Sequence, residues 1–303
     1  MAKDSNVNAA RKAKNGTPLT IFFTFLSILW VSPIFIVLIN SFKKKTFINK
    51  EPFKLASSVG SKGGSALEQF FFTSKKSFVH WDNYIGGIEK IDFFKAFGYS
   101  LFITVASVLV IIICTSMCGW YITRVKTKFT SAIYYLCVFS MIIPFQMVMF
   151  SLSKVADMLR FDNPIGIILV YLGFGAGLAV FMFCGFVKAI PLEIEEAAMI
   201  DGCNPIQTFF GIVLPILKPT CITVAILQAM WIWNDYLLPY LVLDIKKYKT
   251  IPIAIQYLKG GYGSVDMGAM MAMLVLAIIP IIIFYAACQK YIIEGVVAGA
   301  VKG

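Results

Sequence analysis

Charged residues are scarce in this sequence. Only 14% of the 303 residues are charged, whereas soluble domains usually carry about 25%. Histidine is represented by His80 alone, so no Ser/His/Asp hydrolase site can be assembled. The sequence also lacks a Gly-x4-Gly-Lys-Ser/Thr loop, the element that cradles nucleotide phosphates. These shortages exclude the common soluble enzyme classes and argue against ATP hydrolysis by this chain.

Long hydrophobic runs take the place of the missing charges. Hydrophobic residues make up 59% of the chain, and they gather in runs long enough to cross a bilayer, which takes about 20 helical residues. Because every backbone polar group in lipid must be satisfied within its segment, these runs are predicted to be helices. The six predicted spans are Pro18–Phe42, Phe97–Thr123, Thr130–Ser153, Asn163–Val187, Pro219–Leu243 and Met267–Gln289.

The predicted fold is therefore an all-α integral membrane protein with six transmembrane helices. A transmembrane domain over residues 18–290 follows a short tail, 1–17, and precedes another, 291–303. The first run is too long for a signal-peptide core and is read as a span. The formal net charge of +11 is expected to meet lipid headgroups rather than nucleic acid, because the basic residues form no long stripe.

Cysteine and charge counts settle less. The seven cysteines suggest neither a disulfide framework nor a metal site, since no histidine or carboxylate joins them in a ligand pattern. Lysine and arginine counts favour neither orientation clearly, because the long loop 43–96, which includes a Lys-rich insert at 43–76, carries many of them. The orientation therefore has to come from a motif.

The loop between spans four and five, residues 188–218, has strong local signals. Pro191 suits the first turn of a helix, and the acids that follow it favour the positive end of the helix dipole. Gly202 supplies a left-handed stop. Asn204 can cap a second helix that opens with Pro205. The loop is thus predicted to form a helix, a sharp turn and another helix. From these signals alone, a docking helix and an amphipathic helix on the membrane surface remain open.

The spacing in this loop carries a family resemblance. Glu196-Ala197-Ala198, then three residues, Gly202, nine residues, Ile212, one residue and Leu214-Pro215 resembles the cytoplasmic signature loop of ATP-driven (ABC) importer permeases. Trp81-Asp82-Asn83-Tyr84 and the run from Trp231 to Pro239 look like elements of the carbohydrate permeases. The tail from Gly295 to Gly303 resembles the end of the maltose-type second permease.

The resemblance implies a bacterial cell-membrane protein that works in an assembly. Its expected partners are a second homologous permease, two ATPase subunits that bind ATP and Mg, an external solute-binding protein, a sugar substrate and the lipid bilayer; no cofactor is expected in this chain. The signature loop would be the cytoplasmic coupling helix, which also places both termini in the cytoplasm. The implied ATPase contacts are Glu195, Glu196, Ala197, Ala198, Asp201, Gly202, Leu214 and Pro215, with Gly299, Lys302 and Gly303 of the tail.

Other candidate residues lie in the spans and in an external loop. Amides, carboxylates and aromatic rings suit the hydroxyls and apolar faces of sugars. The candidate substrate path comprises Gln146, Gln228, Trp231, Asn234, Asp235 and Tyr236; an interfacial aromatic belt and a structural role for Asp235 stay open. The loop with Gly260, Gly261 and Tyr262 is a candidate contact for the binding protein or a plain connector. Pro144 predicts a kink that is either a hinge or simply packed.

The predicted function is that of a sugar or oligosaccharide permease in an ABC importer, without enzymatic activity of its own. An ABC permease for amino acids, peptides or polyamines is the alternative. An ion-coupled secondary transporter is less favoured, since the spans lack a chain of buried acids and bases.

Overall fold

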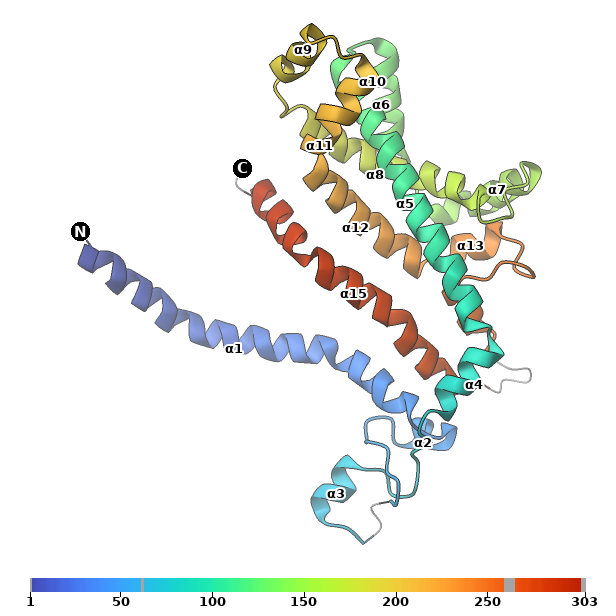
Figure 1. Cartoon of the computed structure of the whole chain (residues 1–303). Coiled ribbons are helices and arrows are strands. Elements are labelled where there is room, and N and C mark those ends of the chain that lie inside the picture. Colours follow the sequence, from blue (N-terminus) through green and yellow to red (C-terminus); the bar gives the residue numbers. More distant parts are fainter. Residues whose placement is uncertain (1, 61–62, 259–264, 301–303) are drawn as a thin grey trace. The chain divides into compact units, whose positions relative to one another are not determined.

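The computed structural model describes residues 2–60, 63–258 and 265–300 (Figure 1). These residues are mostly helical, and isolated β-bridges pair Lys43 with Phe78 and Leu55 with Phe72. The helices are α1 (Ala2–Ser41), α2 (Lys45–Lys50), α3 (Ala66–Phe71), α4 (Asp82–Lys90), α5 (Phe93–Arg124), α6 (Lys128–Ser140), α7 (Phe145–Met158), α8 (Gly166–Val187), α9 (Leu192–Ile200), α10 (Pro205–Thr208), the π-helix η1 (Phe209–Val213), α11 (Leu214–Ile216), α12 (Lys218–Asn234), α13 (Leu237–Val242), α14 (Ile251–Gln256) and α15 (Met267–Ala300). The all-α fold is confirmed.

Four of the predicted spans are single helices long and apolar enough to cross a membrane. They are Thr17–Ser41, Phe93–Arg124, Gly166–Val187 and Met267–Tyr291. The third predicted span is the bent pair of α6 and α7. The fifth, predicted over Pro219–Leu243, contains α12 and α13, and the second bent pair joins α12 to a segment of the predicted loop. The α6–α7 pair is bent by 111°, and the segment Pro205–Ile216 meets α12 at 75°. The described helices therefore give four spans, or six when each bent pair counts as one.

The third and fifth spans differ from the continuous helices that hydropathy predicts. The third breaks after Ser140, and Pro144 becomes the residue before α7, with its ψ at 135°. A proline disfavours helical backbone in the residue before it, which explains the interruption. The fifth helix ends at Asn234 because Asp235 leaves the helical region, with ψ at 123°, and its carboxylate accepts hydrogen bonds from the backbone of Leu237 and Leu238. The hydropathy signal does not register either break.

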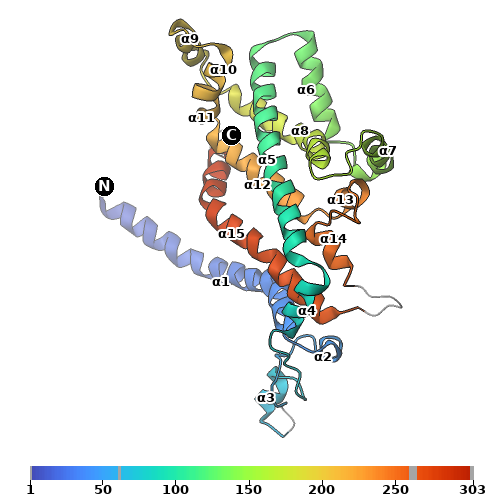
Figure 2. The same cartoon turned by 45° about the vertical axis from the view of Figure 1, so that its right-hand side comes forward.

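The chain divides into two compact units. One comprises Met1–Lys90 with Leu258–Leu276, and the other comprises Ile91–Tyr257 with Ala277–Gly303. We call them the first and second units. In the second unit, α5 and α8 form the most extensive helix pairing (Figure 2). A side chain at Gly119 would lie 2.8 Å from Phe183, so α5 approaches α8 closely because this position has no Cβ.

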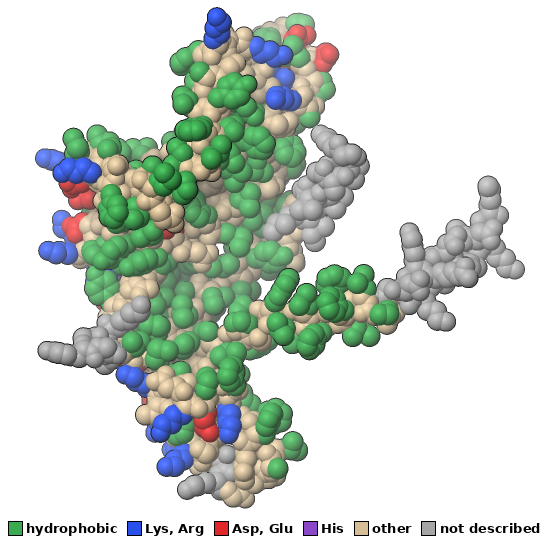
Figure 3. Space-filling view, turned by 180° about the vertical axis from the view of Figure 1, so that it is seen from behind, with side chains coloured by type: hydrophobic (Ala, Val, Ile, Leu, Met, Phe, Trp, Pro, Cys, Tyr) green, Lys and Arg blue, Asp and Glu red, His purple; other side chains and the backbone are tan. Residues whose placement is uncertain are grey.

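In the first unit, α1 exposes an apolar surface of the kind that faces lipid. No residue in the most apolar window of Thr17–Ser41 is buried. Figure 3 shows hydrophobic side chains along its described length. Asn83 and Tyr84, from the motif Trp81-Asp82-Asn83-Tyr84, hold the end of α1. The Asn83 amide donates to the carbonyls of Ser41 (2.7 Å) and Lys43 (3.0 Å). The Tyr84 hydroxyl and the Ser41 hydroxyl share a hydrogen bond of 2.7 Å. This motif thus has a structural role.

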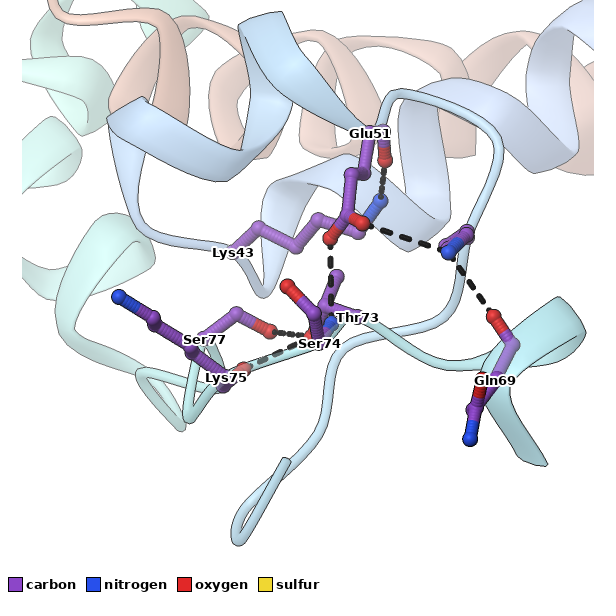
Figure 4. Close-up of polar contacts among 8 residues, drawn as sticks. Lys43, Glu51, Gln69, Thr73, Ser74, Lys75 and Ser77 are labelled. Carbon is purple, nitrogen blue, oxygen red and sulfur yellow. Dashed lines mark hydrogen bonds and ion pairs between the residues drawn. The ribbon is translucent and has the colours of Figure 1, made fainter. Parts of the chain in front are cut away.

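The Lys-rich insert is a folded segment built around a buried lysine. Lys43 has no exposed surface, and its ammonium donates to the Glu51 carbonyl at 2.9 Å (Figure 4). It also donates to Asn40 Oδ1 (2.9 Å) and to the Pro52 carbonyl (3.4 Å). Burial lowers the pKa of Lys43 to about 8, and the nearby Glu51 carboxylate partly offsets that effect. Three acceptors for three N–H groups make the burial tolerable.

One glycine of α8 is required by packing within this chain. A side chain at Gly177 would lie 2.7 Å from the Cys137 carbonyl and from Ser140 Oγ of α6, whereas one at Gly173 would meet nothing within 4 Å. Gly177 is therefore needed where α8 crosses α6.

We predict that Gly177→Ala destabilises the protein, because the added methyl group meets a backbone carbonyl that cannot move freely. Overpacking of this kind costs about 1–3 kcal/mol. Thermal unfolding of the detergent-purified protein measures the effect. Gly173→Ala is the matched control and should unfold at or above the wild-type temperature. Equal behaviour of the two variants would contradict the α6–α8 contact.

Candidate functional site

The loop after α8 folds as its sequence predicts. Pro191 precedes α9 and acts as its N-cap residue, one position before the helix that was expected to contain it. Gly202 has φ of 85°, a backbone conformation that glycine adopts without strain. Asn204 and Gln207 then form a reciprocal capping box at the start of α10, whose first residue is Pro205. The helix–turn–helix prediction is confirmed, and α9 with α10 lies at one end of α5 (Figure 2).

A buried ion pair holds α9 in place. Glu195 is 3% exposed, and its Oε1 accepts hydrogen bonds from Arg124 Nε (2.9 Å) and Nη2 (2.6 Å). Trp120 Nε1 donates to the other carboxylate oxygen at 2.9 Å. Arg124 also donates to the carbonyl of Ile190 at 2.9 Å. The last turn of α5 thus clamps both the start of α9 and the residue that leads into it.

The carboxylate is fully compensated, which is the condition for burying a charge. Each of its oxygens has a donor, and the guanidinium also binds the Ile190 carbonyl just before the helix. Arg124 and Trp120 were missed by sequence reasoning, because they lie 71 and 75 positions from Glu195. Their one signal was that Arg124 ends a hydrophobic run.

The clamp decides which side of α9 faces outward. Ala198 is 4% exposed and lies on the same inward side as Glu195. Two of the implied ATPase contacts, Glu195 and Ala198, therefore face the interior of this chain, and Glu195 is an internal anchor. Both face inward because residues three apart share a helix face. Ala197 and Glu196 remain exposed.

The outward side of α9 carries large apolar residues. Ile200 is 86% exposed and Met199 is 54% exposed, and Asp201 and Gly202 beside them are exposed as well. Sequence reasoning did not single out Met199 or Ile200. Exposed apolar groups on a short polar loop are typical of an interaction surface. We call Met199, Ile200, Asp201 and Gly202 the α9 tip.

A π-helix links this loop to the next span. The segment Phe209–Val213, η1, is followed by α11, which contains Leu214 and Pro215. Leu214 is half-buried and Pro215 is exposed. Proline has no N–H to donate, and π-turns are common at functional sites. The α9 tip is thus connected to α12 through the bend of 75° rather than through a straight helix.

The candidate substrate-path residues do not form one site. Gln228 is buried, donates to the Gly175 carbonyl at 3.3 Å, and leaves its Oε1 without a hydrogen-bond partner among the described residues. Trp231 stands edge-on to Tyr171 with ring centroids 5.5 Å apart, and Tyr171 donates to Asp235 at 3.1 Å. These contacts are those that a structural role for Asp235 requires, and its place in the substrate path stays a prediction.

The remaining candidates are dispersed. Asn234 donates to Met230 of its own helix, Tyr236 stacks on Tyr240, and Gln146 is exposed on α7. Gly299 lies in the last turn of α15. Gly260, Gly261, Tyr262, Lys302 and Gly303 fall outside the described residues. The assignment of these residues to a substrate path, a binding-protein contact or an ATPase contact stays a prediction.

The spans and the loop resemble those of known transport proteins. Residues 111–297, which include α9 and its anchor Arg124, match the family described as "Binding-protein-dependent transport system inner membrane component". The chain belongs to this family. It is a multi-pass membrane component of a transport system, and the likeness runs over most of its length.

Similar proteins match this chain over more than nine tenths of its length. It is 39% identical to "Probable starch degradation products transport system permease protein AmyC" of Thermoanaerobacterium thermosulfurigenes, over 94% of this chain and 96% of that one. It is 29% identical to "Melibiose/raffinose/stachyose import permease protein MelC" of Bacillus subtilis (strain 168), over 97% and 99%. A chain of a bacterial ABC transporter that imports alginate has the same fold, with a TM-score of 0.71 and 18% identity over 92% and 96%.

We predict that Glu195→Gln frees α9. Losing the carboxylate leaves Arg124 without its charged partner, at a cost of about 3 kcal/mol, the low end for breaking a buried ion pair. Amide exchange in residues 192–203 should then be about 100-fold faster by hydrogen-exchange mass spectrometry. Glu193→Gln removes the same charge from an exposed position of the same helix and should change exchange only a few-fold. Unchanged exchange in Glu195→Gln would show that the clamp does not hold the helix.

Proposed function

We propose that this chain is a permease subunit of an ABC importer that carries a sugar or oligosaccharide across the membrane. Family membership supports the transport role. The assignment of a sugar cargo is supported by the relatives, whose names include starch degradation products, melibiose, raffinose and stachyose. Arabinooligosaccharides and multiple sugars appear among the others. The alternative cargoes, amino acids, peptides and polyamines, have no such support.

The observation that carries the mechanism is the rigidly held α9 with its exposed tip. The Glu195–Arg124 clamp fixes the helix to α5, while Met199 and Ile200 face outward. A partner that grips the tip can therefore move α5 directly, and it can move α12 through η1 and α11. We propose that this partner is an ATPase subunit, which binds ATP and Mg and supplies the energy. The chain itself would perform no hydrolysis.

The orientation follows from the same proposal. If the α9 tip meets an ATPase, residues 188–218 lie in the cytoplasm, and so do both termini. Residues 43–96 then lie outside, where an external solute-binding protein would deliver the sugar to a pathway formed with a second permease. Closure of the ATPase pair would pull on the α9 tip and change the access of that pathway from one side to the other.

Ile200→Asp tests the docking role. An acid in place of an exposed apolar anchor should remove ATPase subunits from the purified complex and lower sugar uptake by tenfold or more, because a buried unpaired charge at an interface is costly. Ile206→Asp is the matched control. Ile206 is 65% exposed on the neighbouring α10, and its variant should retain both properties. Ala198 is unsuitable for this purpose, since it is buried.

Uptake of labelled oligosaccharides, monosaccharides and amino acids by cells with and without this gene tests the cargo. Loss of one sugar class is expected, with rescue by the wild type and by Ile206→Asp but not by Ile200→Asp. Loss of amino-acid uptake alone would overturn the sugar proposal. Retention of ATPase subunits and uptake in Ile200→Asp would overturn the docking proposal.

A further inference from the structure

The helix α3 of the Lys-rich insert has an exposed apolar face. Leu67 and Phe70 are each 71% exposed, and Phe71 is 51% exposed. Residues that are three and four positions apart lie on one side of a helix, so these three side chains form a single surface. We call Leu67, Phe70 and Phe71 the α3 face. None of them belongs to the α9 tip or to the candidate substrate path.

The polar residues of α3 serve to build the helix. Ser65 and Glu68 form a reciprocal capping box at its start, and the Gln69 side chain donates to the Gly64 carbonyl at 3.0 Å. With 3.6 residues in each turn, Glu68 and Gln69 lie away from the α3 face. The helix is therefore amphipathic, although it has only six residues.

Hydrogen bonds fix α3 to the neighbouring segment of the insert. The Leu55 amide donates to the Phe71 carbonyl at 2.7 Å, and the Thr73 amide donates to the Leu55 carbonyl at 3.0 Å. The Lys54 ammonium donates to the Gln69 carbonyl at 2.8 Å. These contacts hold both the last turn of α3 and the residues after it. The α3 face is therefore kept in one place on the insert.

Apolar side chains connect α3 to the end of α1. Leu38 and Ile39 of α1 line an apolar groove together with Leu55 and Phe72 of the insert. Phe72 directly follows the last residue of α3, and an isolated bridge pairs it with Leu55. The apolar surface of the span therefore continues through this groove towards α3.

The α3 helix lies on the side of the insert from which α1 reaches it, as both Figure 1 and Figure 2 show. The span within α1, Thr17–Ser41, has no buried residue in its most apolar window. Such a span crosses the hydrocarbon, so the bilayer lies on the side from which α1 comes. Figure 3 shows hydrophobic side chains gathered on that side of the insert. The α3 face therefore lies on the bilayer side.

The charge of the insert also suits a lipid surface. Residues 43–76 contain eight lysines and two glutamates. Anionic headgroups attract basic segments that lie beside a span. Interfacial helices combine such basic charge with exposed Phe and Leu side chains. Both features of an interfacial element are thus present in one folded segment.

We propose that the insert is a membrane-surface anchor whose α3 face lies among the headgroups and the upper acyl chains, on the side of the bilayer where α1 ends. The anchor holds that end of α1 at a fixed depth, because Lys43 and Asn83 tie the end of α1 to the insert and to α4. This inference rests on α1 being a span. It depends on no assignment of the cargo, the ATPase contact or the orientation.

Photocrosslinking of the full chain in proteoliposomes tests this placement. The photoreactive residue p-benzoylphenylalanine replaces Leu67 or, in the matched control, Gln69. Both positions are exposed, and their side chains point to nearly opposite sides of the same helix. Because an interfacial helix buries only its apolar side in lipid, the lipid adduct should be about tenfold more abundant at position 67 than at position 69. Mass spectrometry of the α3 peptide measures both adducts.

Equal amounts of lipid adduct at the two positions, or none at position 67, would overturn the proposal. An adduct between position 67 and another protein subunit in the complete importer would also overturn it, by showing that protein covers the α3 face.

The unmodified chain provides a second measurement, with a phospholipid that has a diazirine in its acyl chain close to the headgroup. This lipid should label both α1 and the α3 peptide after illumination. Labelling of α1 without labelling of the α3 peptide would overturn the proposal, and labelling of α1 serves as the internal control. Neither readout depends on sugar uptake or on ATPase binding.

Discussion

The buried pair of Glu195 and Arg124 is the interaction on which the second unit depends at its loop end. A carboxylate and a guanidinium at the end of a membrane span cannot be left unpaired without a cost of several kcal/mol. Here each oxygen of Glu195 has a donor, and Arg124 reaches back to the Ile190 carbonyl. The pair therefore fixes both the position and the rotation of α9. Because Glu195 and Ala198 must face α5, Ile200 must face outward, and the surface available to a partner follows from the clamp.

A second polar network holds a span end in place in the first unit. The Lys43 ammonium satisfies its three donors with oxygens of Asn40, Glu51 and Pro52, and Asn83 holds the last carbonyls of α1. These contacts turn a lysine-rich insert into a folded segment and hold the end of α1 in place. In both units a span end is therefore tied down by a cation: buried Lys43, whose partners lie within nine positions, and partly buried Arg124, whose partners lie 66 and 71 positions away.

Much of this fold follows from local sequence. The six spans could be predicted because lipid forces every apolar run to satisfy its own backbone, and the α9 turn because Gly202 and Asn204 have few other roles at such positions. The bend before Pro144 was predicted only as a kink, since its size depends on what α7 packs against. The end of the fifth helix was missed because a single acid, Asp235, does not end an apolar run that continues to Leu243. The clamp was missed because nothing near Glu195 indicates a partner 71 positions away. The contacts of Asn83 with the carbonyls of Ser41 and Lys43 were missed for the same reason, since they lie 42 and 40 positions away. Long-range pairing of single polar residues leaves no periodic pattern.

We propose that the clamp transmits the motion of α9 to the spans. The direct measurement is the number of sugar molecules transported per ATP hydrolysed by the complete importer in proteoliposomes, compared between the wild type and Glu195→Gln. We expect that the variant still assembles and hydrolyses ATP, while its transport per ATP falls by tenfold or more, because a loosened α9 moves without moving α5. An assembled variant with the wild-type ratio would contradict it.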